Sequence, residues 1–159
     1  MEKIASFTIN HEKLLPGLYI SRIDKINNEV ITTFDIRITK PNTEPVIDNA
    51  ALHAIEHLGA TFLRNHQLVK NSIIYFGPMG CRTGFYLIMA GNLKPLDIYD
   101  LIKEMIDYII NYEGLIPGAS SIECGNYLEL NLSTAKFYAK KYKEEVLDSF
   151  TEDRYNYPL

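Results

Sequence analysis

The sequence of 159 residues lacks the features that mark several large classes of protein. It has no basic excess, because 20 Asp and Glu outnumber 16 Lys and Arg, whereas a nucleic-acid-binding domain shows a basic patch or stripe. No stretch approaches the roughly 18 uninterrupted apolar residues of a membrane-spanning helix. Residues 1–10 also lack the basic segment and apolar run of a secretory signal. We therefore expect a cytoplasmic protein that binds neither nucleic acid nor a membrane.

Cysteine and histidine are scarce, with two and four residues respectively. In a reducing compartment two cysteines rarely form a disulfide. The chain has no C-x-x-C pair of the kind that builds a closed structural zinc site. Cys81 and Cys124 are therefore better interpreted as a metal ligand or a nucleophile.

The pattern of apolar residues and turns predicts a mixed fold. A chain of this length suits one domain, which would bury roughly two-thirds of its unfolded surface. Strands and helices do not alternate regularly, so we predict a single domain over residues 1–159, of the α+β class, with helices packed on a largely antiparallel sheet. The expected strands are 18–23, 29–39, 72–76 and 83–90, the expected helices are about 48–66, 95–112 and 133–150, and 155–159 is expected to be a loose tail.

The strongest local signal is the segment His53-Ala54-Ile55-Glu56-His57. Positions three and four apart share a helix face, so the two imidazoles and the carboxylate would project together. The opposite face is apolar, with Leu52, Ile55, Leu58 and Phe62. Imidazole is a common ligand of zinc, iron and cobalt, and a nearby carboxylate can transfer protons. The segment predicts a metal site, although two histidines on an exposed helix also fit it.

Both cysteines lie in loops marked by glycine. Cys124 is our candidate for a third ligand, which would leave a tetrahedral metal with one open position. Cys81 follows a Gly-Pro-Met-Gly turn between two strands, where backbone amides can approach a ligand closely, and Arg82 beside it favours thiolate. If Cys81 joins the site, it supplies an acid/base group opposite Glu56, as proton transfer between carbons requires. A buried structural cysteine is the alternative for Cys81.

Two other functions fit part of this pattern. H-x-x-E-H is the signature of one class of metallopeptidase, in which the glutamate activates water. That function predicts an acidic third ligand and no need for Cys81. A metal-sensing module, whose open coordination position is filled by a partner, predicts metal-dependent association without turnover.

Several segments, in order, resemble the S-ribosylhomocysteine lyases, the LuxS enzymes of autoinducer-2 synthesis. The resemblance covers nearly the whole chain, and separate motifs in the right order are far more specific than any one of them. The matching segments are 6–7 with His11, 34–37 with 41–42, 53–58, 64–66, 78–86 and 123–127.

The resemblance implies a metal-dependent lyase. It would cleave S-ribosylhomocysteine to homocysteine and 4,5-dihydroxy-2,3-pentanedione, the precursor of the quorum-sensing signal autoinducer-2, by carbonyl migration and β-elimination of the thioether. It implies that His53, His57 and Cys124 bind one divalent ion per subunit, usually Fe²⁺, which Zn²⁺ or Co²⁺ can replace. Glu56 and Cys81 match the general acid/base pair.

The resemblance also implies a homodimer with sites at the interface. Ser6, His11 and Arg37 match residues that contact the substrate, some of them supplied by the neighbouring subunit. From the residues alone, Arg37 lies on the more polar face of its strand, where it could bind a carboxylate or be a lone surface arginine.

One segment departs from the family pattern. Gly77 and Tyr75 stand where the family usually has a serine and often an acidic residue. Because this segment lines the substrate pocket in relatives, we expect altered affinity for the amino-acid end of the substrate before any loss of activity.

Overall fold

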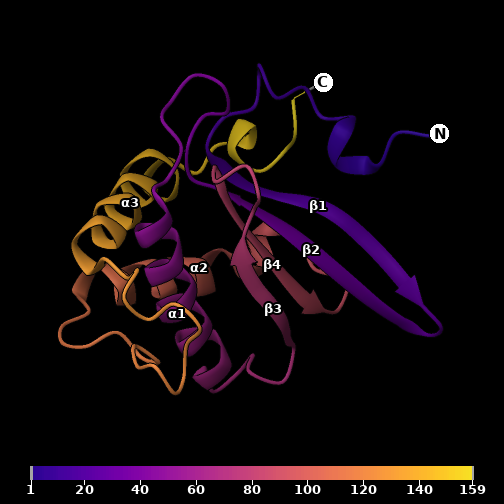
Figure 1. Cartoon of the computed structure of the whole chain (residues 1–159). Helices are drawn as coiled ribbons and strands as arrows, with labels where there is room; N and C mark the ends of the chain where they lie inside the picture. Colours follow the sequence, from indigo (N-terminus) through magenta and orange to yellow (C-terminus); the bar gives the residue numbers. More distant parts are fainter. Residues whose placement is uncertain (1, 159) are drawn as a thin grey trace.

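A computed structural model describes residues 2–158 and has one sheet and three main helices (Figure 1). The sheet is antiparallel throughout, with strand order β1-β2-β4-β3. The predicted α+β class is therefore confirmed. The strands are β1 (Gly17–Ile26), β2 (Glu29–Arg37), β3 (Ile73–Pro78) and β4 (Gly84–Ala90); the helices are α1 (Asn49–Asn65), α2 (Pro95–Asn111) and α3 (Leu132–Glu145), with short 3-10 turns η1 (Ala5–Phe7), η2 (Leu147–Ser149) and η3 (Glu152–Arg154).

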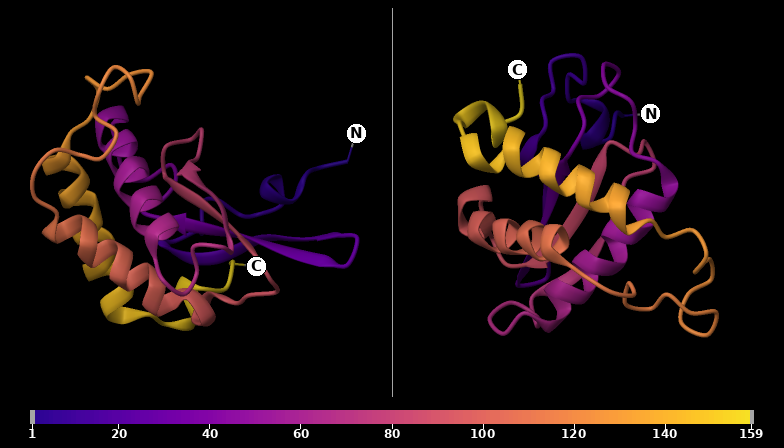
Figure 2. Two further views of the ribbon diagram at one scale, coloured as in Figure 1. Left: turned by 90° about the horizontal axis from the view of Figure 1, so that it is seen from below. Right: turned by 90° about the vertical axis from the view of Figure 1, so that its left-hand side faces the viewer.

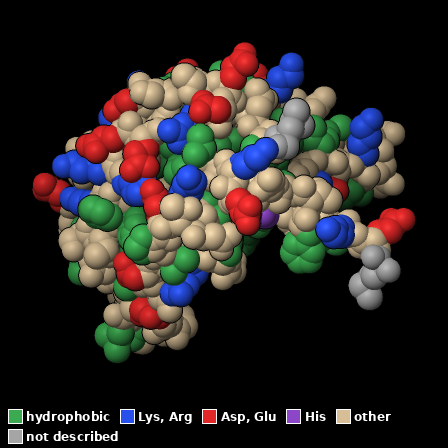
Figure 3. All heavy atoms as spheres, turned by 90° about the horizontal axis from the view of Figure 1, so that it is seen from above, with side chains coloured by type: hydrophobic (Ala, Val, Ile, Leu, Met, Phe, Trp, Pro, Cys, Tyr) green, Lys and Arg blue, Asp and Glu red, His purple; other side chains and the backbone are tan. Residues whose placement is uncertain are grey.

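The three helices lie together on one face of the sheet (Figure 2). Their apolar sides meet the inward-facing residues of the central strands, because successive side chains of a strand point to opposite faces. This core includes Phe34, Ile36, Phe85, Leu87, Ala54, Leu58, Ile102 and Ile106. No helix within residues 2–158 is long and apolar enough to cross a membrane. On the face shown in Figure 3, acidic and basic side chains intermix.

Helix α1 forms where the sequence predicts it and presents the expected face. The Asp48 side chain caps it by accepting the N–H of Ala51 at 2.9 Å, which satisfies one of the free amide donors of the first turn. Gly59 lets α1 approach β3 closely, since a side chain there would collide with the ring of Phe76. The apolar side of α1 is buried, and the opposite side is left half-buried.

Helix α3 is shorter than predicted. Its N-cap is Asn131, whose side chain accepts the N–H of Thr134 at 3.1 Å, and the helix ends at Glu145. The chain then continues as η2, so the expected helical end near residue 150 is wrong. The polar, weakly amphipathic sequence of α3 gives no clear stop, because the boundary depends on packing rather than on a glycine or proline.

The face of the sheet that carries Asp35 and Arg37, which the sequence predicts to be the more polar one, is covered. Asp35 and Arg37 on β2 are only 1% and 3% exposed. Residues 155–158 cover this region: the Tyr157 ring stacks on Tyr19 with centroids 4.7 Å apart, and Tyr19 Oη donates to the Asp153 carbonyl at 3.1 Å. The loose-tail prediction is therefore wrong for residues 155–158, and residue 159 lies outside the described part. The lone surface arginine alternative for Arg37 is also wrong.

Candidate active site

Three potential metal ligands meet between α1 and the connection from α2 to α3. One ligand atom from each of His53, His57 and Cys124 lies within 4.8 Å of the others. Cys124 Sγ is 3.3 Å from His53 Nε2, although 71 residues separate the two in the sequence. The two imidazole rings are arranged edge to face, with centroids 4.6 Å apart. The predicted third ligand is thus placed beside the helical pair.

Backbone carbonyls orient both imidazoles. His53 Nδ1 lies 3.0 Å from the Glu129 carbonyl oxygen, and His57 Nδ1 lies 2.7 Å from that of Pro117. Because a carbonyl oxygen only accepts, each Nδ1 must carry the hydrogen, which leaves the Nε2 lone pair for a metal. This is the arrangement that metal-binding histidines commonly have in proteins. The sequence pattern gives no sign of these carbonyl partners.

The connection that supplies Cys124 has a shape suited to this task. Gly118 has a φ of +74°, and a Cβ there would lie 3.1 Å from His57 Nδ1, so glycine allows the loop to pass close to the ring. The N–H of Cys124 donates to the Ser120 carbonyl at 3.0 Å, and the N–H of Asn126 points at Cys124 Sγ at 3.4 Å. A backbone donor toward the sulfur suits a thiolate ligand.

The donor set fits a divalent transition metal. A thiolate with two imidazoles accommodates Zn²⁺, Fe²⁺ or Co²⁺. Three protein ligands leave one position open, which is typical of catalytic rather than structural sites. Glu56 lies half-buried on the same helix and makes no hydrogen bond or ion pair within residues 2–158. Its carboxylate is therefore available for proton transfer.

A second group of polar residues surrounds Cys81. Arg37 donates through Nε to Asp35 Oδ1 at 3.1 Å and through Nη2 to Asp35 Oδ2 at 2.5 Å. Its remaining nitrogen, Nη1, donates to Thr83 Oγ1 at 2.5 Å and lies 3.8 Å from Cys81 Sγ. Thr83 Oγ1 is in turn 3.1 Å from the same sulfur. The group thus places a fixed cation and a hydroxyl beside an exposed thiol.

This environment favours the thiolate form of Cys81. Partial burial by itself raises the pKa of the thiol, but the hydrogen bonds of Thr83 and the charge of Arg37 outweigh it, so the pKa is lowered. Arg82 does not supply this charge, because its φ is +59° and its Nη1 donates to Asn49 Oδ1 at 3.3 Å. The prediction that Arg82 favours the Cys81 thiolate is therefore wrong. The alternative of a buried structural cysteine at Cys81 is also wrong, because Cys81 is exposed.

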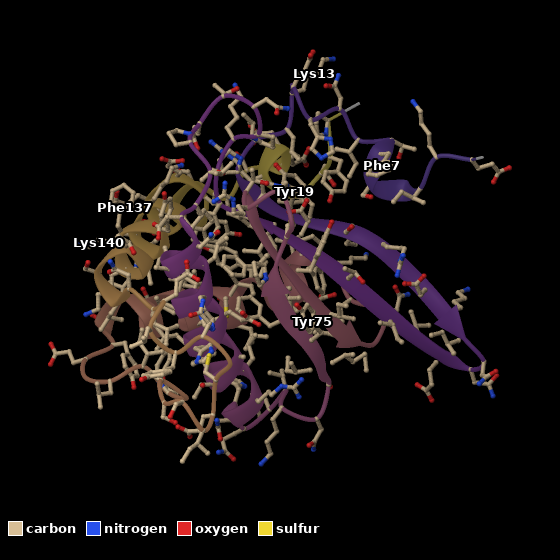
Figure 4. The ribbon with its side chains drawn as sticks, in the orientation of Figure 1. Phe7, Lys13, Tyr19, Tyr75, Phe137 and Lys140 are labelled. Atoms are coloured by element: carbon tan, nitrogen blue, oxygen red, sulfur yellow. The ribbon has the colours of Figure 1, made fainter. Side chains whose placement is uncertain are left out.

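Ser6 lines a pocket of about 240 Å³ on the face of the sheet that lies away from the helices. The other lining residues are Ile4, Ser21, Arg22, Thr33, Tyr75, Tyr86 and Ile88. Tyr75 lies on β3 (Figure 4), and its phenol occupies the space beside Gly77 that a side chain at residue 77 would need. The two departures from the family pattern are therefore coupled in space.

His11 is half-buried near the start of the chain. One of its ring nitrogens lies 3.0 Å from the Ile9 carbonyl oxygen. Within residues 2–158, no hydrogen bond or ion pair joins His11, Ser6 or the Cys81 group to the metal-ligand cluster. The predicted site residues thus fall into separate groups in one chain.

The sequence reasoning missed three members of these groups. Asp35 and Thr83 hold Arg37, and Tyr157 donates its hydroxyl to Asp35 Oδ2 at 2.8 Å. Asp35 could have been found from the sequence, because Asp35 and Arg37 are two residues apart and therefore lie on the same face of the strand. Nothing in the sequence pattern pointed to Tyr157, which lies 122 residues from its partner.

The antiparallel sheet covered by helices carries a His-His-Cys cluster that could hold a metal ion, and three protein ligands are typical of a catalytic rather than a structural metal site. The sequence model of the family described as S-Ribosylhomocysteinase (LuxS) matches residues 4–153, and the chain belongs to this family. The predicted resemblance is confirmed.

Close relatives support the same assignment. Proteins named S-ribosylhomocysteine lyase from Finegoldia magna, Clostridium acetobutylicum and Borreliella afzelii are 60%, 56% and 54% identical over 158 residues. Each alignment covers 99% of this chain, and 99%, 99% and 100% of the respective relative. These relatives give no support to the peptidase or metal-sensing alternatives, and the third residue of the cluster is a cysteine rather than an acid.

Proposed function

We propose that this protein is a metal-dependent carbon–sulfur lyase that cleaves S-ribosylhomocysteine to homocysteine and 4,5-dihydroxy-2,3-pentanedione, the autoinducer-2 precursor. The observation that carries the proposal is the cluster of His53, His57 and Cys124, with both imidazoles oriented by carbonyls, in a chain of the LuxS family. We further propose that residues 1–159 form one catalytic domain.

The three cluster residues would hold one divalent ion per subunit. We propose Fe²⁺ as the native ion, with Zn²⁺ or Co²⁺ as substitutes, because a soft thiolate and two imidazoles suit all three. When bound, the ion would supply Lewis acidity that polarises the sugar carbonyl. A cytoplasmic location agrees with this ligand set, because a reducing compartment keeps Cys81 and Cys124 as free thiols.

The reaction requires proton transfers at neighbouring carbons. Moving the carbonyl from C1 to C2 and then to C3 takes a proton from one carbon and returns one to the previous carbonyl carbon. Removal of the C4 proton then expels the homocysteine sulfur from C5. We assign these transfers to Glu56 and Cys81, because the Glu56 carboxylate makes no hydrogen bond or ion pair within residues 2–158 and the Thr83 hydrogen bonds and the Arg37 charge lower the pKa of the Cys81 thiol.

Substrate binding is assigned to Ser6, His11 and Arg37. Ser6 supports this assignment best, since it lines a pocket beside the sheet. In that pocket the phenol of Tyr75 lies against Gly77. This chain therefore presents a phenol at the position where the family often has a carboxylate. Tyr75→Asp should therefore change KM for S-ribosylhomocysteine more than kcat; an unchanged KM would remove this segment from the binding site.

The separation of the two groups favours a homodimer with shared sites. Arg37 lies on the sheet face away from the helices, whereas the metal ligands lie on the far side of α1 from its buried face. In the connection that supplies Cys124, Leu115, Ile122 and Leu128 are 89%, 95% and 82% exposed, and a second copy would remove such apolar side chains from water. Light scattering should give the mass of a dimer, and an active monomer would contradict this arrangement.

The central test is thiol release from S-ribosylhomocysteine by anaerobically purified, metal-loaded protein. Wild type should release homocysteine, and Glu56→Gln and Cys81→Ala should each lose on the order of 10²-fold or more in kcat, the usual contribution of a positioned acid or base. Both variants should keep their bound metal. No release by folded, fully metallated wild type would overturn the proposed function.

A further inference from the structure

The C-terminal segment docks against the sheet beside the start of β1. The Tyr157 and Tyr19 rings are 4.7 Å apart and nearly parallel, at 14°. Arg154 Nη1 donates to the Pro16 carbonyl at 3.0 Å, and the Tyr19 hydroxyl donates to the Asp153 carbonyl at 3.1 Å. Tyr19 lies where β1 begins (Figure 4), close to where the C-terminal segment ends (Figure 1). These contacts fix the position of the Tyr157 ring.

The Tyr157 hydroxyl completes the hydrogen bonding of a buried carboxylate. Asp35 Oδ1 accepts from Arg37 Nε, and Asp35 Oδ2 accepts from both Arg37 Nη2 and the Tyr157 hydroxyl, the last at 2.8 Å. Asp35 is 1% exposed, so water has no access to replace the phenol. Burial raises the pKa of Tyr157, and its phenol therefore stays a donor over the working pH range.

The same hydrogen-bonded chain continues to Cys81. With two of its nitrogens held by Asp35, the Arg37 guanidinium is fixed as a plane. The third nitrogen is thereby directed at Thr83 Oγ1 and toward Cys81 Sγ, at 2.5 and 3.8 Å. A change in the orientation of Asp35 would move the charge that faces the thiol.

We propose that Tyr157 is a positioning residue for Cys81: its hydroxyl holds Asp35 in the orientation that keeps Arg37 beside the thiol. The C-terminal segment is therefore part of the acid/base apparatus and not only a cover for the sheet. The role of Tyr157 in catalysis rests on the proposed function, but its effect on the pKa of the Cys81 thiol does not.

The charged and titratable groups around Cys81 come from several elements. Arg37 on β2 is the cation that faces the sulfur, and Asp35 lies behind it on the same strand. Tyr86 on β4 lies close enough for the charges of Asp35, Arg37 and Cys81 to influence its pKa, which is raised mainly by burial. Among these charged groups Arg37 is the one that favours thiolate, in addition to the hydrogen bonds of Thr83, and Arg37 also donates to the Thr83 hydroxyl, so its placement affects both influences on Cys81.

The test is the rate of Cys81 alkylation by iodoacetamide as a function of pH, in metal-loaded wild type, Tyr157→Phe and Tyr155→Phe. Peptide mapping by mass spectrometry separates Cys81 from Cys124. Tyr157→Phe removes one oxygen and keeps the ring on Tyr19. Tyr155→Phe is the matched control, because its hydroxyl makes no hydrogen bond within residues 2–158 and its ring packs on Phe150.

Tyr157→Phe should move the alkylation midpoint upward by about half a pH unit, a part of the roughly 1–3 units that a nearby opposite charge gives. It should also lower kcat for lyase turnover about 10-fold with little change in KM. Tyr155→Phe should match wild type in both. An unchanged midpoint in folded Tyr157→Phe, or an equal shift in both variants, would overturn the proposal. Because alkylation needs no substrate, these results stand whether or not wild type turns over S-ribosylhomocysteine.

Discussion

Replacing Asp35 by alanine should be among the most destabilising single changes in the sheet. Asp35 and Arg37 are 1% and 3% exposed, and the variant removes both hydrogen bonds between them. The guanidinium would stay buried with its contacts to Thr83 and Cys81 but without a carboxylate partner. Loss of one partner from a buried ion pair typically costs about 3–5 kcal/mol, much of it from the charge left unpaired.

That cost is large against the roughly 5–15 kcal/mol that stabilises a typical domain. For a chain of this size, 1 kcal/mol corresponds to a Tm change of about 2–4 °C, so Asp35→Ala should lower Tm by about 6–20 °C. Urea unfolding followed by circular dichroism gives the free energy directly. The double variant Asp35→Ala with Arg37→Met should regain part of the loss, because it removes the unpaired charge as well.

Strand β1 provides a matched control. Arg22 and Asp24 have the same spacing and make an ion pair at 2.7 Å, but their side chains are 63% and 34% exposed. Asp24→Ala should therefore change the free energy of unfolding by less than about 1 kcal/mol, as is usual for surface pairs. If the losses caused by Asp35→Ala and Asp24→Ala were equal, the reasoning from burial would be refuted.

Three further predictions concern the metal site and one buried tyrosine. Cys124→Ala should lose the bound metal while Cys81→Ala keeps it, and equal metal loss by elemental analysis would contradict the assigned roles. Gly118→Ala should weaken metal binding and stability, because the new methyl group would lie 3.1 Å from His57 Nδ1 at a φ of +74°; an unchanged metal affinity by competition with a chelator would argue against it. Burial raises the pKa of Tyr142 well above its ordinary value, so the phenol ionises more easily in the unfolded chain and stability is fully present below about pH 10. Above that pH, Tyr142 should reduce the free energy of unfolding by about 1.4 kcal/mol per pH unit, and Tyr142→Phe should flatten this decline in urea titrations.

Local patterns were sufficient for much of the fold and for the outline of the metal site. Helix α1 and the spacing of His53 and His57 on it were predicted because they depend on residues within one or two turns. The antiparallel sheet followed from alternation and from turn residues, which are equally local. The identity of Cys124 as the third residue was a prediction from its loop alone, and the structure places its sulfur 3.3 Å from His53.

The end of α3 and the docking of the C-terminal segment were not predicted. A tail of tyrosine, asparagine and proline has no periodicity, and its position depends on whether an aromatic surface such as Tyr19 is available elsewhere in the fold. Sequence patterns contain no information about such distant partners.

The sequence by itself determined the donor types, their helical spacing and the family, because these follow from residue identity and local order. Only the tertiary structure decided that Arg37 is buried against Asp35, that carbonyls of a distant connection orient both histidines, and that Tyr157 joins the group around Cys81. Each of these contacts joins residues across strands or across most of the chain. Their geometry is fixed by the packing of the helices and the C-terminal segment on opposite faces of one sheet.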